Sequence, residues 1–367
     1  MSTIRAIAFY LPQFHPILEN DRWWGKGFTE WTNVVKAKPF FKGHYQPHLP
    51  ADLGFYDLRV PEVREAQAKM AADYGISGFC YYHYWFGGGK RLLNRPFDEV
   101  LESGTPDFPF CLCWANETWT GIWHGLPNKT LIEQTYPGVE DYERHFNLLV
   151  KAFKDPRYIK VDGKPLFMVY QPTYIPDLEV FVATFRKLAE RNGLPGLYLV
   201  ATNVWYPNWA AGDHGFDAIT LSNHEKLTYA PSPSRLVNFY RKQKNRIRPA
   251  RCYKRIFKRP THVYRYEEAM KYFVNDDVTN SLYYPMVIPN WDNTARSGLN
   301  AFVLYGSTPD LFRKVLAIAT QRISSYPQEN KIIFIKSWNE WAEGNHLEPD
   351  REFGLGYLEA VREVLHA

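Results

Sequence analysis

Eight short apolar runs alternate with helical patterns along the chain, and this alternation limits the fold more than any other feature. The runs are rich in β-branched and aromatic residues, which are typical of strands. They cover Ile4–Phe14, Ile76–Phe86, Phe108–Asn116, Pro165–Gln171, Leu197–Val204, Ala218–Asn223, Tyr284–Pro289 and Lys331–Trp338. Helical patterns lie near Pro61–Gly75, Arg95–Ser103, Glu140–Lys154, Asp177–Arg191, Pro309–Ile323 and Gly356–His366. Strands that are apolar on both faces indicate a parallel sheet covered by helices, hence the α/β class.

Eight strand units favour a single closed (β/α)8 TIM barrel. A doubly wound open sheet is the structural alternative, but no G-x-G-x-x-G follows the first strand. A barrel of about 250 residues plus two insertions accounts for the length. The insertions are 16–57, after the first strand, and 225–282, after the sixth. We therefore expect one catalytic domain over 1–367, with both insertions above the C-terminal face of the barrel.

Aromatic and polar residues follow the strands, at the barrel face where active sites form. The composition includes 12 Trp and 25 Tyr, and flat aromatic rings suit the C–H faces of pyranose sugars. For the aromatic residues and for His83, the alternative is packing in the core. For Glu117, the alternative is an acidic residue in the first turn of a helix. The candidate substrate-binding residues are Tyr10, His83, Tyr84, Trp114, Asn116, Glu117, Trp291, Asp292, Trp338 and Asn339.

The segment SWNEWAEGNHLEP, after the eighth strand, contains the candidate catalytic residues Glu340 and Glu343. Their spacing of three places both carboxylates on one side of a first helical turn or tight loop. Cleavage of an acetal needs one carboxyl to protonate the leaving oxygen and a second, ionised one. Mutual repulsion and burial against Trp338 and Trp341 are expected to raise one pKa. The alternative is an acidic cluster that merely stabilises a helix N-terminus.

Two resemblances add to this interpretation. The stretch NEWAEGNHLEP resembles the strand-eight signature of family 99 of the glycoside hydrolases, which comprises endo-α-mannosidases and endo-α-mannanases. From AFYLPQFHP through WWGKGFTEW, GFCYYHYWF and CLCWANE to PNWDNTAR, nearly the whole chain is similar to WbsX-like proteins. Those proteins occur in O-antigen and other surface-polysaccharide clusters and are often labelled glycosyltransferases.

The family 99 resemblance implies a retaining mechanism through a 1,2-anhydro sugar. By motif position, Glu340 is implied as the base on the sugar's 2-hydroxyl and Glu343 as the acid/base. This chemistry implies α-linked, manno-configured sugars of the mannose or rhamnose type, within a bacterial surface polysaccharide. Ala342 departs from the family pattern, which tends to have a histidine there. A glycosyltransferase or transglycosylase of O-antigen or capsule biosynthesis is the alternative, and a non-catalytic carbohydrate-binding barrel is the second.

Other functions find little support in the sequence. There is no P-loop or Rossmann fingerprint and no D-x-D motif, so no cofactor is expected. His44 and His48 are four residues apart, but Pro47 breaks the helix that this spacing would need, so no metal is expected either. The four cysteines have no zinc-finger spacing and are expected to be reduced.

Partners and location follow from charge and hydropathy. The stretch 241–265 holds eleven Lys or Arg and no acid, which suits contact with an anionic glycan or headgroup, or else a solvated surface. Nucleic acid is not expected, because no binding fold accompanies this basic stretch. No apolar run would span a bilayer, and the N-terminus lacks a secretory signal pattern, so we expect a cytoplasmic protein. The partner expected is an oligo- or polysaccharide, and the oligomeric state is left open.

Overall fold

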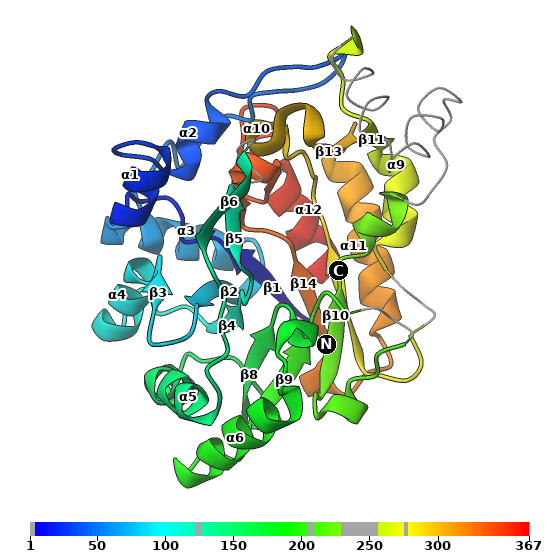
Figure 1. The fold of residues 1–367 in the computed structure, drawn as a ribbon. Helices are drawn as coiled ribbons and strands as arrows, with labels where there is room; N and C mark the ends of the chain where they lie inside the picture. Colours follow the sequence, from blue (N-terminus) through cyan, green and yellow to red (C-terminus); the bar gives the residue numbers. More distant parts are fainter. Residues whose placement is uncertain (1–3, 122–125, 205–207, 229–255, 275–277, 367) are drawn as a thin grey trace.

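Eight parallel strands close into a barrel in the computed structural model, which describes residues 4–121, 126–204, 208–228, 256–274 and 278–366 (Figure 1). Strand β1 (Arg5–Tyr10) pairs with β2 (Ile76–Trp85) on one side and β14 (Ile332–Ile335) on the other, which closes the sheet. The remaining barrel strands are β4 (Phe110–Trp114), β8 (Lys164–Val169), β9 (Tyr198–Ala201), β10 (Ala218–Leu221) and β12 (Tyr283–Val287). Each predicted run matches one of these strands, although β8 and β12 begin one residue earlier than predicted. The closed barrel is confirmed, and the open-sheet alternative was wrong.

An outer layer of helices covers the barrel, as the parallel pairing requires. All six predicted helices are present: α3 (Pro61–Asp73), α4 (Arg95–Ser103), α5 (Val139–Lys154), α6 (Leu178–Arg191), α11 (Pro309–Arg322) and α12 (Gly356–Leu365). Proline lies in the first turn of α3, α4 and α11, where its missing N–H is harmless. Between β9 and β10, the described residues form only the 3-10 turn η3 (Gly212–His214), so the layer has no full helix there.

Shorter elements lie at the barrel ends and were not predicted. The loop after β4 forms a hairpin, β5 (Trp119–Gly121) with β6 (Leu126–Ile132), which stands above the strands in Figure 1. Strand β13 (Phe302–Tyr305) pairs outside the barrel with β11 (His262–Arg265). The other short elements are β3 (Arg91–Leu92), β7 (Lys160–Val161), α9 (Tyr266–Ala269), α10 (Thr294–Ser297), η2 (Pro172–Tyr174), η4 (Asn223–Thr228), η5 (Met270–Tyr272), η6 (Gly298–Asn300) and η7 (Gln328–Asn330).

The first insertion, 16–57, contributes two short helices to the region above the barrel. These are α1 (Leu18–Trp24) and α2 (Glu30–Val34), both in the upper part of Figure 1. The ring centroids of Trp31 and Trp341 lie 5.6 Å apart, so α2 packs directly on the loop that follows β14. The first insertion therefore supports the segment in which the two candidate catalytic glutamates lie.

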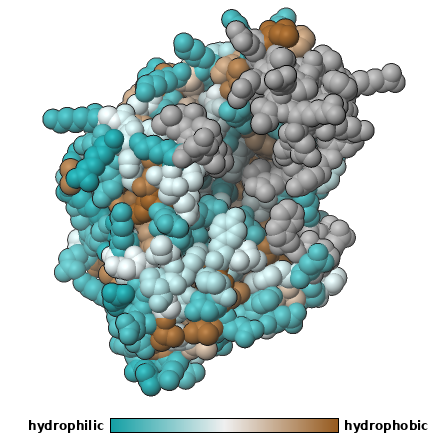
Figure 2. All heavy atoms as spheres, in the orientation of Figure 1, coloured by the Kyte–Doolittle hydropathy of each residue, from teal (hydrophilic) through white to brown (hydrophobic). Residues whose placement is uncertain are grey.

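The second insertion, 225–282, is described in part. Residues 229–255 lie outside the described residues, and with them most of the basic stretch 241–265 and Cys252. The other three cysteines, Cys80, Cys111 and Cys113, are buried free thiols in the barrel. No helix among the described residues has the length and apolarity needed to cross a membrane. On the face in Figure 2, apolar side chains form separate small groups within a mostly hydrophilic surface.

Candidate active site

The loop after β14 folds into a small hairpin that presents both candidate glutamates. Strand β15 (Asn339–Glu340) pairs with β16 (Asn345–His346), and the turn η8 (Trp341–Glu343) joins them. Gly344 ends this turn with a φ of 57°, and a Cβ there would lie 3.0 Å from the Cβ of Asp292. Glycine is favoured here, because the left-handed conformation and the close neighbour both oppose a side chain. The glycine of the motif thus lets the chain reverse immediately after Glu343.

Glu340 and Glu343 both line one cavity of about 560 Å³ at the C-terminal end of the barrel. Their residues are 6% and 8% exposed, so both carboxylates are nearly withdrawn from bulk water yet border open space. Aromatic side chains make up much of the wall: Tyr82, Tyr84, Trp119, Tyr170, Tyr174 and Trp291. Amides and hydroxyls fill the gaps between the rings, from Gln171, Thr173, Asn203, Ser222 and Asn223. A wall that combines aromatic rings with polar and charged groups suits a sugar, which has both C–H faces and hydroxyl groups.

Arg296 links the two carboxylates. Its Nη1 atom lies 2.7 Å from Oε1 of Glu343 and 3.7 Å from Oε1 of Glu340. Because both oxygens lie within 4 Å of one nitrogen, the two carboxyl groups are close neighbours. On its other side, the Nε atom of Arg296 lies 3.0 Å from Oε2 of Glu30, which comes from α2 of the first insertion. The guanidinium therefore holds three carboxylates around a single positive charge.

Burial raises the pKa of Glu343 to about 7, with a further contribution from the negative charge of Glu340. Arg296 and Lys336 act in the opposite direction but do not cancel these effects. Together with Glu30, the group contains two cations and three carboxylates, so one bound proton leaves it without net charge. A carboxyl that titrates near neutral pH has the property required of a general acid/base.

Lys336 provides the second positive charge of the site. Its Nζ lies 5.6 Å from the ring centroid of Tyr170 and 5.1 Å from that of Trp291, in reach of a cation–π interaction with each. Burial alone would lower its pKa, but Tyr170, Glu340 and Glu343 raise it above the ordinary value. Lys336 is therefore charged, and its field stabilises negative charge on the neighbouring carboxylates.

Glu340 is also held by its own loop. The hydroxyl of Ser337 donates a hydrogen bond of 2.9 Å to its Oε2 atom, so Oε1 faces Arg296. A side chain with both oxygens engaged has few accessible rotamers. The two carboxylates are thus positioned by local contacts, before any substrate is considered.

The family model described as Glycosyltransferase WbsX matches residues 6–361 of this chain. The chain belongs to the WbsX family. Among curated proteins, WxcX from two strains of Xanthomonas campestris pv. campestris is 37% identical over 368 residues. The match covers 98% of this chain and 49% of WxcX, so the chain spans about half the length of the curated relatives it matches.

Solved structures share the fold across the full barrel. A glycoside hydrolase-like protein has a TM-score of 0.60 and 15% identity, over 100% of this chain and 94% of that one. The family 99 endo-α-mannosidase of Bacteroides thetaiotaomicron, in complex with bis-tris propane, has a TM-score of 0.59 and 15% identity, over 99% and 96%. The resemblance to both families that the motifs indicated is confirmed, and at this identity the structural likeness establishes the fold.

Three of the predicted substrate-binding residues line the cavity of this WbsX-family chain: Tyr84, Glu117 and Trp291. Tyr84 follows the second strand, and its ring meets that of Trp119 edge-on at 5.0 Å. Glu117 accepts a hydrogen bond of 3.0 Å from the side chain of Gln171, which lines the same wall. The structure thus brings these three and the two glutamates together around one space.

Three predicted residues on the barrel strands point away from the cavity, toward the helices. Tyr10 donates a hydrogen bond of 2.6 Å to Gln67 of α3. The His83 Nε2 atom lies 2.9 Å from that of His145 on α5. Trp114 packs with a centroid distance of 5.4 Å on Phe181, from α6. The expectation of substrate contact is corrected for these three residues, because their side chains fill the layer between barrel and helices.

Of three others outside the cavity, two hold loops together and one lies in the core. The Asn116 side chain exchanges hydrogen bonds of 2.7 and 2.8 Å with the backbone of Gln171. Asn339 exchanges bonds of 2.7 and 3.1 Å with the backbone of Leu11. Trp338 is 0% exposed in the core. These residues support the site from outside, so the sequence-based expectation of substrate contact is corrected for them as well.

Asp292, the last of the predicted residues, faces a different cavity. Its Oδ2 atom lies 2.5 Å from Nε2 of His44, and 2.8 Å from Nε2 of Gln46. Its Oδ1 atom accepts a bond of 2.6 Å from the hydroxyl of Thr294. Both carboxylate oxygens of Asp292 thus accept hydrogen bonds from the protein, and they hold the loop after β12 in place. The expectation that Asp292 contacts substrate is therefore corrected.

Several wall residues were not among the predicted substrate-binding residues: Tyr82, Trp119, Tyr170, Gln171, Asn203, Arg296 and Lys336. A signal for Tyr82 was present. Side chains alternate across a strand, so Tyr82 and Tyr84 must share a face while His83 lies on the opposite face. Arg296 had no such signal, because it lies in α10 beyond the strand end and meets Glu30 across 266 residues of sequence.

Proposed function

We propose that this chain is a carbohydrate-active enzyme that hydrolyses α-linked, manno-configured glycosides with retention of configuration. In this proposal Glu343 is the acid/base, and Glu340 is the base on the sugar's 2-hydroxyl. The observation that carries it is the pair of nearly buried carboxylates bordering one cavity, with the pKa of Glu343 raised to about 7. Cleavage of an acetal needs such a pair, with one carboxyl protonated and the other ionised.

The proposed reaction balances in two steps. In the first, Glu343 gives its proton to the glycosidic oxygen, the bond from C1 to that oxygen breaks, and the 2-hydroxyl oxygen bonds to C1 as its proton passes to Glu340. In the second, water attacks C1 and gives a proton to Glu343, the bond from C1 to the 2-oxygen breaks, and the 2-oxygen recovers its proton from Glu340. Two displacements at C1 retain its configuration. The net result is hydrolysis, with both glutamates returned to their starting states.

The charges of the site support these roles. Lys336 and Arg296 stabilise the negative charge that Glu340 needs in order to accept a proton. Burial and the charge of Glu340 keep a proton on Glu343 near neutral pH, where it has to be donated. Arg296 also bonds Glu343 at 2.7 Å, which favours the ionised form that follows proton donation. Different neighbours thus stabilise the protonated and the ionised state of Glu343.

Trp291 is proposed to form part of the sugar platform. Replacing it by leucine keeps an apolar side chain but removes the flat ring, so we expect KM for a glycan substrate to rise about tenfold, with a smaller change in kcat. Steady-state kinetics measures this effect. Trp209→Leu is the matched control, because Trp209 packs on His214 and Phe216 and does not line the cavity. Equal changes in KM for both variants would contradict the assignment.

The family description names a glycosyltransferase, so group transfer is the second candidate function. Hydrolysis and transfer separate in one experiment with two arms. The protein is incubated with surface polysaccharide in water, and separately with sugar nucleotides and an acceptor glycan. The proposal predicts new reducing ends in the first arm and no released nucleotide in the second. Nucleotide release with an intact polysaccharide would reject hydrolysis in favour of transfer.

A further alternative is that the chain is not an enzyme but a barrel that only binds sugars. It predicts that the wild type binds glycans without changing them, and that Glu340→Gln alters nothing beyond affinity. The polysaccharide arm of the same experiment, repeated with Glu340→Gln, distinguishes the cases. Loss of cleavage by at least about 100-fold in the variant supports catalysis.

A further inference from the structure

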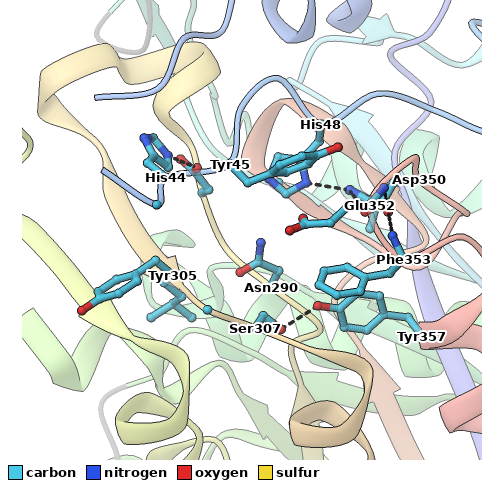
Figure 3. Close-up of a pocket in the computed structure, with 16 residues that line it drawn as sticks. His44, Tyr45, His48, Asn290, Tyr305, Ser307, Asp350, Glu352, Phe353 and Tyr357 are labelled. Carbon is cyan, nitrogen blue, oxygen red and sulfur yellow. Dashed lines mark hydrogen bonds and ion pairs between the residues drawn. The ribbon is translucent and has the colours of Figure 1, made fainter. Parts of the chain in front are cut away.

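A second, smaller cavity of about 90 Å³ lies beside the candidate active site (Figure 3). Its wall comes from four segments: residues 43–48 of the first insertion, the loop after β12, the end of β13, and the chain from Gly344 to Tyr357. Asp292 and Gly344 border the small cavity, and the residues just before them, Trp291 and Glu343, border the large one. These two short stretches therefore separate the cavities.

Three metal-ligating side chains meet in this cavity: His48, His346 and Asp350. One ligand atom from each lies within 4.8 Å of the other two. The Nε2 atom of His346 lies 3.4 Å from Nδ1 of His48 and 3.8 Å from Oδ2 of Asp350. The three residues are 5%, 4% and 3% exposed, so the cluster is buried. Figure 3 shows His48 and Asp350 on the same side of the cavity.

The donor atoms are oriented by their own hydrogen bonds. Nδ1 of His346 lies 3.0 Å from the backbone oxygen of Glu348, and a carbonyl oxygen only accepts, so Nδ1 carries the proton of the neutral ring. The lone pair on Nε2 then faces His48 and Asp350. The Oδ1 atom of Asp350 accepts from the backbone N–H groups of Glu352 and Phe353 at 2.9 and 2.7 Å, which leaves Oδ2 for the cluster. Such outer hydrogen bonds are typical of metal ligands.

The spacing differs from that of an ordinary histidine pair. His83 and His145 are also buried and face each other. Their Nε2 atoms lie 2.9 Å apart, which is the length of a normal hydrogen bond, and no carboxylate forms a cluster with them among the described residues. The 3.4 Å between His346 and His48 is long for a hydrogen bond. It matches the edge of a tetrahedron around zinc, which is roughly 3.3 Å for metal–nitrogen bonds near 2.05 Å.

We propose that His48, His346 and Asp350 form a binding site for a divalent transition-metal ion of the Zn²⁺ type. Two imidazoles and one carboxylate suit zinc and its neighbours, whereas Mg²⁺ and Ca²⁺ take oxygen ligands. The sequence analysis expected no metal because it paired His48 with His44. The structure instead pairs His48 with His346, across 298 residues of sequence, and gives His44 to Asp292.

The proposed ion would clamp the first insertion to the hairpin that presents the two glutamates. His346 pairs with Asn339 across that hairpin, and its ring stacks on Trp341 with a centroid distance of 3.7 Å. None of the three ligands lines the larger cavity, so the ion takes no part in sugar chemistry. This inference does not rest on the proposed hydrolysis and can be tested without a substrate.

The test is a metal titration of the full chain after removal of bound metal by a chelator. We expect one equivalent of Zn²⁺ by equilibrium dialysis, little binding of Mg²⁺, and a rise in Tm of roughly 5 °C at saturating Zn²⁺. Co²⁺ in place of Zn²⁺ is expected to give visible absorption bands. Absence of stoichiometric Zn²⁺ binding would overturn the proposal.

Asp350→Asn and His48→Gln provide the variants. Asparagine keeps the oxygen that accepts the two backbone hydrogen bonds and removes only the ligating carboxylate, so this variant is expected to fold even if His48→Gln does not. We expect each to weaken Zn²⁺ binding roughly 100-fold or more and to abolish the Co²⁺ bands. His44→Gln, in the wall of the same cavity but outside the cluster, is the matched control and should keep both. Full Zn²⁺ affinity in Asp350→Asn would reject the site.

Discussion

Glu343→Gln is expected to lower the rate of glycoside cleavage by roughly 100- to 10,000-fold near pH 6, the contribution typical of a general acid/base. Glutamine keeps the size and polarity of the side chain but cannot give up a proton. The variant should fold and bind glycan as the wild type does, because Glu343 borders open space and the amide oxygen still meets Arg296. Initial rates of reducing-end formation, measured beside glycan affinity, test this expectation.

The pH dependence of the wild type tests the same role from another direction. Burial and the charge of Glu340 raise the pKa of Glu343 to about 7, so the acid is protonated below this pH and ionised above it. Since the first step requires the proton, kcat/KM should fall as pH rises through about 7.

Glu352→Gln is the matched control for this pH profile. Burial, with the charge of Asp350, raises the pKa of Glu352 to about 7 as well, but Glu352 lies outside the active-site cavity. The control should therefore keep both the rate and the alkaline fall of the wild type. If Glu352→Gln removed that fall, or if Glu343→Gln retained the rate, the role of Glu343 would be rejected.

Arg296→Met is expected to lower the free energy of unfolding by about 3–5 kcal/mol, the cost of removing one partner from a buried ion pair. Arg296 has a side chain that is 14% exposed, and it contacts Glu30, Glu340 and Glu343. Methionine matches much of the apolar stem but leaves three carboxylates facing one another without the intervening cation. Urea unfolding, monitored by circular dichroism, measures the loss.

Arg313→Met provides the comparison for this stability effect. Arg313 also pairs with two carboxylates, those of Asp310 and Glu363, but its side chain is 40% exposed. Water screens such pairs, so the expected loss is below about 1 kcal/mol. Similar losses in the two variants would show that Arg296 is not the centre of a buried charge cluster.

The barrel was predictable because its signal is local and repeated. Each strand is a short apolar run such as KIIFI, and each helix has its own start and stop residues, so eight independent patterns agree on one topology. The same locality made Glu340 and Glu343 predictable. Three residues apart in one loop, they could hardly project to distant places.

The rest of the site depends on orientation and on distant pairing, which local patterns do not report. His83 was chosen for its chemistry, but alternation along β2 turns it toward α5 and turns Tyr82 into the cavity. Glu30 reaches Arg296 because α2 of the first insertion folds onto the loop after β14. Without a known path for that insertion, no spacing in the sequence indicates such a contact.

The anomeric configuration of the first product tests the paired-carboxylate mechanism most directly. Proton NMR, recorded during cleavage of an α-mannoside before mutarotation, resolves the two anomers. The account predicts that the α-anomer appears first, and that a 2-deoxy analogue, which lacks the internal nucleophile, is not cleaved. Initial appearance of the β-anomer, or cleavage of the 2-deoxy analogue at a comparable rate, would contradict it.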